Sequence, residues 1–157
     1  MNSSNSSAKV HPAASARTFW VMGDQVSKRG KLDGTEFNIV DVMIPPGSGT
    51  PPHTHASPEI FRILQGTVRI WSLSDGKPVE TDAVAGDVVT IPAHAPHAYR
   101  NVSPLPALMM SVVDDQMVGF FEAAASDEPL AGPPTPEAIG RIVALTATHG
   151  INVLQAA

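Results

Sequence analysis

Short apolar runs alternate with turn-forming residues through the first two thirds of the chain. Gly or Pro interrupts the sequence between most of the runs, which cover residues 37–44, 60–64, 67–73, 87–91 and 107–113. Runs of this length, rich in Val and Ile and broken this regularly, predict the strands of an all-β sandwich or barrel. Gly66 separates two runs and predicts a tight hairpin, and Asp75-Gly76 indicates a second turn of the same kind.

The pattern changes after about residue 122, where a Pro-rich connector precedes an expected helix. Thr135 suits the N-cap, Pro136 the first helical position and Glu137 the positive end of the helix dipole. Apolar residues at 139, 142 and 143 mark one face, and Gly150 is placed to end the helix. We therefore expect three segments: a disordered tail over 1–17, a β-barrel domain over 18–122, and a connector with a C-terminal helix over 123–157.

The composition narrows the classes of function. The chain has 157 residues, enough for one domain with a sizeable core, and its net charge is −5. This charge gives no electrostatic footprint for nucleic acid or an anionic membrane, and no apolar run is long enough to span a bilayer. The Ser/Asn/Ala-rich N-terminus has no apolar core of a secretory signal, which favours a cytoplasmic protein. There is no cysteine, so any metal must be bound through nitrogen and oxygen.

Three residues in the stretch GSGTPPHTHASPE suggest a metal site. His53 and His55 are two residues apart and Glu59 follows four residues later. On an extended segment, alternate side chains point to the same side and lie roughly 6.5–7 Å apart. Imidazoles on one face beside a carboxylate are typical of a metal site. The alternative interpretation is a solvated polar loop after the Pro-Pro turn.

A second cluster about forty residues further on supplies what the first one lacks. It reads GDVVTIPAHAPHAYRN, and His97 within it offers a third imidazole. Three His and one carboxylate leave one or two metal positions open for water, oxygen or substrate, as catalytic metals require. The ligand types suit Fe, Mn, Ni, Co or Zn and do not choose among these divalent transition metals.

Both segments resemble the two conserved motifs of the cupin family. The first, over residues 47–66, matches at every defined position, and the second, over 86–101, matches at all but one. The matching residues are Gly47, His53, His55, Glu59, Gly66, Gly86, Pro92, His97 and Asn101. This resemblance implies a small antiparallel jelly-roll barrel (a double-stranded β-helix) with one metal held by His53, His55, Glu59 and His97.

The departure from the second motif is His94, which stands where the family has Gly. One interpretation is an ordinary turn residue with positive φ, a conformation that His tolerates better than most residues. The other is a base beside the metal or at the mouth of the pocket.

The segments outside the motifs resemble bacterial single-domain cupins related to quercetin 2,3-dioxygenase. The resemblance implies an oxidoreductase that opens a flavonol-like ring with O2, in which Glu59 deprotonates or orients the enol and residues 117–150 form a lid. Glu59 could equally be only a fourth ligand. Two other functions stay open: a metal-dependent lyase or isomerase without O2, and a sensor that binds a small molecule without turnover.

The expected pocket is mostly apolar, as a small aromatic or enol-bearing substrate requires. Its candidate residues are Phe37, Ile39, Phe61, Ile63, Trp71, Tyr99, Met109 and Met110. By analogy with cupins that associate through sheet edges, we also expect a homodimer in which residues 18–26 add a strand to a partner.

Overall fold

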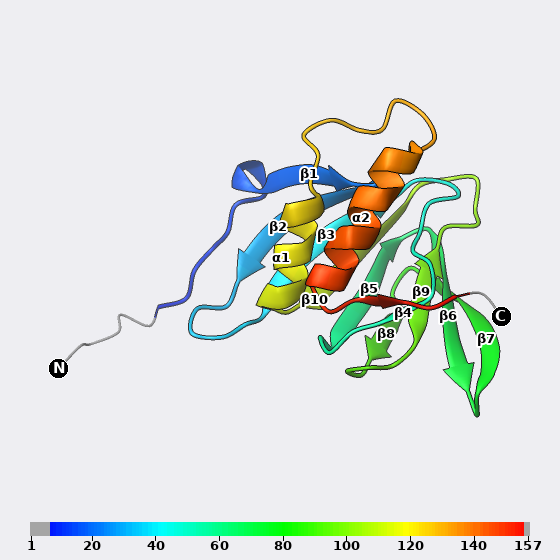
Figure 1. Ribbon diagram of the computed structural model, residues 1–157. Coiled ribbons are helices and arrows are strands. Elements are labelled where there is room, and N and C mark those ends of the chain that lie inside the picture. Colours follow the sequence, from blue (N-terminus) through cyan, green and yellow to red (C-terminus); the bar gives the residue numbers. More distant parts are fainter. Residues whose placement is uncertain (1–6, 156–157) are drawn as a thin grey trace.

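Two antiparallel β-sheets pack face to face, and two helices lie over one end of them (Figure 1). The computed structural model describes residues 7–155. The first sheet has the order β1 (Arg17–Val21), β2 (Asp24–Lys31), β3 (Asn38–Ile44), β10 (Ala107–Val113), β5 (Glu59–Gln65) and β8 (Val88–Ile91). The second has the order β11 (Asn152–Val153), β4 (His53–Thr54), β9 (His97–Arg100), β6 (Thr67–Ser74) and β7 (Lys77–Val84).

The core lies between the sheets because the strands bury alternate residues. In β10 every second residue from Ala107 to Val113 is buried, and β3 and β5 alternate in the same way. Inward residues from both sheets, among them Ile63 and Val68, form one apolar cluster. The all-β prediction is therefore confirmed as two antiparallel sheets, since a side-chain period of two allows one face of each strand to be buried.

The two predicted turns had different outcomes. Asp75 and Gly76 both have positive φ and join β6 to β7 as neighbouring paired strands, so this hairpin is confirmed. The hairpin prediction at Gly66 is wrong, because β5 and β6 lie in different sheets and do not pair. Gly66 has φ +78°, and the chain crosses there from one sheet to the other.

Two α-helices follow the last long strand. The expected C-terminal helix is α2 (Pro136–Thr148), and the Thr135 hydroxyl accepts a hydrogen bond from the Ala138 N–H at its start. The sequence analysis missed α1 (Asp115–Ala124), whose N-cap is Asp114. The last long barrel strand thus ends at Val113, position 122 falls inside α1, and only the short β11 joins the second sheet after the helices.

The N-terminal region contains a short 3-10 helix, η1 (Ala13–Ser15), before β1 begins at Arg17. Residues 1–6 of the expected disordered tail lie outside the described residues. β1 is an edge strand of its sheet, and Trp20 exchanges backbone hydrogen bonds with Ser126 there. Within residues 7–155, neither helix is long and apolar enough to cross a membrane.

Candidate metal centre

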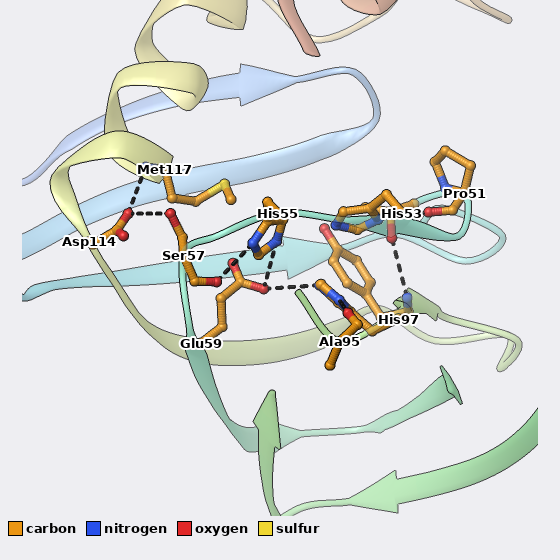
Figure 2. A network of polar contacts seen from close by, with 11 residues as sticks. Pro51, His53, His55, Ser57, Glu59, Ala95, His97, Asp114 and Met117 are labelled. Carbon is orange, nitrogen blue, oxygen red and sulfur yellow. Dashed lines mark hydrogen bonds and ion pairs between the residues drawn. The ribbon is translucent and has the colours of Figure 1, made fainter. Parts of the chain in front are cut away.

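The fold brings the four predicted ligands together from three short segments (Figure 2). His53 lies on β4 and His55 in the loop that follows it, while Glu59 and His97 are the first residues of β5 and β9. His53 and His97 are direct partners in the β4–β9 pairing. Within residues 7–155, His53, His55 and His97 form a group that could share one metal ion. Their ligand atoms all lie within 4.8 Å of one another.

All three imidazoles are oriented by the same local contact. The Nδ1 atom of each histidine lies 2.8 Å from the backbone carbonyl oxygen of a residue two positions away. A carbonyl oxygen can only accept, so each Nδ1 carries the proton and donates it. The neutral form of each imidazole therefore has its lone pair on Nε2, which is the tautomer that a metal requires.

The buried Nε2 atom of His55 has no hydrogen-bond partner. Buried polar atoms in native structures are normally satisfied, so an orphan nitrogen at the centre of a histidine cluster fits a position for a metal ion. His55, Glu59 and His97 are each less than 10% exposed, which keeps bulk water away from the cluster.

Glu59 lies within reach of two of the imidazoles. Its Oε2 atom is 3.2 Å from Nε2 of His97 and 3.6 Å from Nε2 of His55. Burial alone would raise the pKa of Glu59, but the adjacent imidazoles of His55 and His97 outweigh it and hold the pKa at about 2. Glu59 is therefore an anion at neutral pH and could be the fourth ligand.

The pKa values of His53 and His55 shift in opposite directions. Burial, and then repulsion by His97, lowers the pKa of His53 to about 4. Burial also acts to lower the pKa of His55, but the nearby negative charge of Glu59 outweighs it and raises that pKa. His53 is therefore neutral and able to bind a metal well above pH 4, whereas His55 has to release a proton first wherever the pH is below its raised pKa.

Contacts from outside the cluster fix the loop that carries His55. The backbone N–H of His94 donates to the carbonyl oxygen of His55 at 2.7 Å. The Ser57 hydroxyl donates to Asp114, which also caps α1 by accepting from the Met117 N–H (Figure 2). The first motif is thereby tied to the second motif and to the first helix.

A cavity of about 350 Å³ opens beside the cluster, with His53, Glu59 and His97 in its wall. The rest of the wall is mainly apolar and comes from both sheets, α1 and α2. Residues of α2 in the wall include Ile139, Ile142 and Val143, the apolar face expected from the sequence. This combination suits a small apolar molecule with one polar end at the histidines.

Strand parity explains most of the outcomes for the predicted pocket residues, except that of Ile63, which shares the inward face of Phe61 but is buried in the core. Phe61, Tyr99 and Met109 line the cavity, and the other five candidates are not in its wall. Trp71 pairs with Ala98, on the face opposite to that of His97 and Tyr99, and so points away from the site. Phe37 and Ile39 are exposed on the outside of β3 or just before it.

His94 is an exposed turn residue with φ +64°, so the prediction of a positive φ is confirmed. Its side chain is not in the wall of the cavity, and its contribution to the site is the backbone hydrogen bond to His55. These observations fit the turn interpretation and give the alternative of a base no support.

Polar residues of the cavity wall that were not predicted from the sequence include Asp24, Ser48 and Ser111. A usable signal existed for Asp24 and Ser111, since each shares a strand face with buried apolar neighbours. A polar residue on an apolar face is unusual and calls for an explanation.

Comparisons with known proteins agree with the fold. Residues 40–113 match the family model described as Cupin domain. Germin-like protein 5-1 of Oryza sativa subsp. japonica is 28% identical over 121 residues, which are 76% of this chain and 54% of that protein. The chain spans about half the length of the curated relatives it matches.

Among solved structures, the Drosophila melanogaster CENP-C cupin domain aligns with a TM-score of 0.59 and 15% identity, over 70% of this chain and 84% of that one. Bacillus subtilis oxalate decarboxylase, a protein with Mn(II) centres, aligns with a TM-score of 0.56 and 20% identity. That alignment covers 66% of this chain and 28% of the other. At these identities the likeness concerns the fold alone.

Proposed function

We propose that this chain is a metal-dependent oxygenase of the cupin superfamily. The family model over residues 40–113 and the shared two-sheet fold support the membership. The metal ligands would be His53, His55, Glu59 and His97. The observation that carries the proposal is the common orientation of the imidazoles: every Nδ1 is bound to a carbonyl oxygen, and the Nε2 atom of buried His55 is left without a partner.

The donor set fits one divalent transition metal. Three neutral imidazoles and one carboxylate suit Fe, Mn, Ni, Co or Zn, and the set lacks the thiolates that would favour a closed zinc site. A metal bound there would act as a Lewis acid on a substrate oxygen and, if redox-active, would supply electrons to O2.

The protein's own residues would bind the substrate and exclude water. The cavity wall is apolar apart from a few groups, so a small aromatic or enol-bearing compound of the flavonol type is the class of substrate we propose. Residues of α1 and α2 close one side of this cavity, which fits the expected lid.

Glu59 serves better as an anionic ligand than as a base. A general base works best when its pKa is near the operating pH, and the pKa of Glu59 in the metal-free site is about 2. We therefore propose that Glu59 holds the metal and orients the substrate hydroxyl through an ionised oxygen.

The test begins with elemental analysis of protein purified without affinity metals. Samples loaded with Fe, Mn, Ni or Co are then mixed with flavonols and catechols in an oxygen electrode. We expect one metal per chain and O2 uptake with at least one metal, and His97→Ala should lose both. His94→Gly is the matched control, because it removes an exposed imidazole outside the cavity and should retain metal.

The outcomes separate the three classes of function. Absence of O2 uptake with every metal would overturn the oxygenase. Substrate conversion without O2 uptake would then indicate a lyase or isomerase, and ligand binding without conversion would indicate a sensor.

We also propose that the chain forms a homodimer through the outer edge of β1, which is an edge strand of its sheet. The hydrogen bonds between Trp20 and Ser126 already occupy part of that edge. Light scattering coupled to size exclusion should give twice the chain mass, and the mass of a single chain would exclude the dimer.

A further inference from the structure

A buried carboxyl lies in the cavity wall apart from the histidines. Asp24, at the start of β2, is 6% exposed. Its Oδ1 atom accepts a hydrogen bond from the Ser48 hydroxyl and its Oδ2 atom one from the Tyr99 hydroxyl, each at 2.5 Å. Within residues 7–155, no Lys, Arg or His nitrogen lies within 4.0 Å of this carboxyl.

Asp24, Ser48 and Tyr99 lie beside the metal centre, about two residues further along the strands. Tyr99 follows His97 by two residues on the same face of β9, and Phe61 follows Glu59 by two residues on the same face of β5. Two residues of strand span roughly 6.6 Å. The rings of Phe61 and Tyr99 meet edge to face with centroids 6.1 Å apart. The cavity thus has two polar ends with aromatic rings beside it.

A second observation indicates that this cavity receives polar groups. The Ser111 hydroxyl is buried and has no hydrogen-bond partner, and Ser111 lines the cavity. It pairs with Phe61 across β10 and β5, which places it in the wall between the two ends. A buried hydroxyl without a protein partner is unusual, and a ligand in the cavity would supply one.

We propose that Asp24, Ser48 and Tyr99 form a second subsite, which binds a hydrogen-bond donor of a small apolar ligand. The chemistry of the cluster determines this preference. The hydroxyl hydrogens of Ser48 and Tyr99 are both used on Asp24, so only acceptor lone pairs are left to face the cavity. The subsite therefore takes a hydroxyl or an ammonium group and rejects a group that can only accept.

The subsite can be tested without any metal, which separates it from the proposed function. Chelator-treated, isotope-labelled protein is titrated with 2-naphthol and with 2-methylnaphthalene, which differ by a hydroxyl in place of a methyl group. Amide chemical shifts give both the affinity and the location of binding. We expect 2-naphthol to bind about tenfold more tightly, the ratio that one hydrogen bond to a charged group provides, with shifts at cavity residues.

Two further ligands identify the donor. 2-Methoxynaphthalene accepts but cannot donate, so it should bind no better than 2-methylnaphthalene. 2-Naphthylmethylamine carries an ammonium group, and tighter binding than 2-naphthol would assign the subsite to cations, whereas weaker binding would assign it to neutral hydroxyls.

Asp24→Asn should reduce the preference for 2-naphthol to about threefold or less, because the charged acceptor is lost. Asp82→Asn is the charge-matched control, since Asp82 pairs with Arg69 on β6 and is not in the cavity wall. Equal binding of 2-naphthol and 2-methylnaphthalene by the wild-type protein would overturn the proposal without use of a variant. So would an unchanged preference in a folded Asp24→Asn protein.

Discussion

The carboxylate of Glu59 should control whether His55 carries a proton in the metal-free protein. His55 is 3% exposed, and burial by itself favours the neutral imidazole. The negative charge of the nearby Glu59 carboxylate reverses this effect and raises the pKa of His55. In Glu59→Gln the burial is retained and the charge is lost, so the pKa of His55 should fall below its ordinary value of 6.5.

The free energy of interaction between Glu59 and the neighbouring imidazoles follows from the shift in the pKa of Glu59. The hydrogen bonds and charges of the imidazoles lower that pKa from 4.5 to about 2 despite burial. At about 1.4 kcal/mol per pKa unit, this shift corresponds to on the order of 3 kcal/mol. The folded-state pKa is below the unfolded one, so this stabilisation is present above pH 4.5 and is lost as the pH falls toward 2. The stability advantage of the wild-type protein over Glu59→Gln should shrink across the same interval.

Histidine titration by two-dimensional NMR provides the assay. Long-range nitrogen–proton spectra of chelator-treated protein between pH 5 and 8 report the protonation of each imidazole. Glu80→Gln is the matched control, because this exposed carboxylate on β7 makes only a distant ion pair with Arg69. A pKa of His55 that stays raised in Glu59→Gln, as in the control, would refute the assigned coupling.

Three further predictions concern the motif residues and metal uptake. Gly49→Ala should destabilise the protein by several kcal/mol, because a Cβ there would lie 2.1 Å from the backbone oxygen of Tyr99. Gly47→Ala should cost only about 1–2 kcal/mol, because its Cβ meets nothing within 4 Å and the loss comes from the φ of +80° alone. Equal losses in urea unfolding would contradict this. Asn101→Ala should lower the free energy of unfolding by about 3 kcal/mol or more in the same assay, because the fully buried amide donates to two carbonyl oxygens and accepts from Ser103. A loss of less than about 1 kcal/mol would be inconsistent with these hydrogen bonds. Metal affinity should fall as the pH is lowered through the raised pKa of His55, because the metal must displace the proton of that imidazole. Calorimetry in buffers of different ionisation enthalpy should detect the released proton, and a metal affinity that stays constant from pH 5 to 8 would argue against this reasoning.

Local spacing was sufficient to predict that His53 and His55 share one side of the chain, because side chains alternate along an extended segment. That His97 joins them from 44 positions away was predicted from the resemblance to the two cupin motifs, since His97 reaches His53 by strand pairing. The N-cap of α2 at Thr135 was also readable from the local sequence, since capping depends on a few adjacent residues.

Features that depend on strand pairing were not predictable from the sequence. Gly66 looks like a hairpin residue, yet β5 pairs with β10 and β8 rather than with β6. Trp71 lies on the outer face because of its register with β9, and one residue of register moves a side chain to the opposite face. Asp24 meets Tyr99 across 75 positions of sequence, a separation that no local pattern encodes.

The position of His53 depends on the C-terminal segment as well as on its own motif. β4 contains only two residues, and β11 pairs with both of them while β9 pairs with His53 on the other side. The Leu154 N–H also donates to the carbonyl oxygen of Pro52 at 2.8 Å. A two-residue strand has little stability of its own, so the docking of β11 and α2 restricts the conformations of His53. Because linkage is reciprocal, a metal bound by His53 should in turn stabilise the docked C-terminal segment, whose helix forms part of the cavity wall. We therefore expect metal binding and the docking of the C-terminal segment to be coupled through the pairing of β4 with β11.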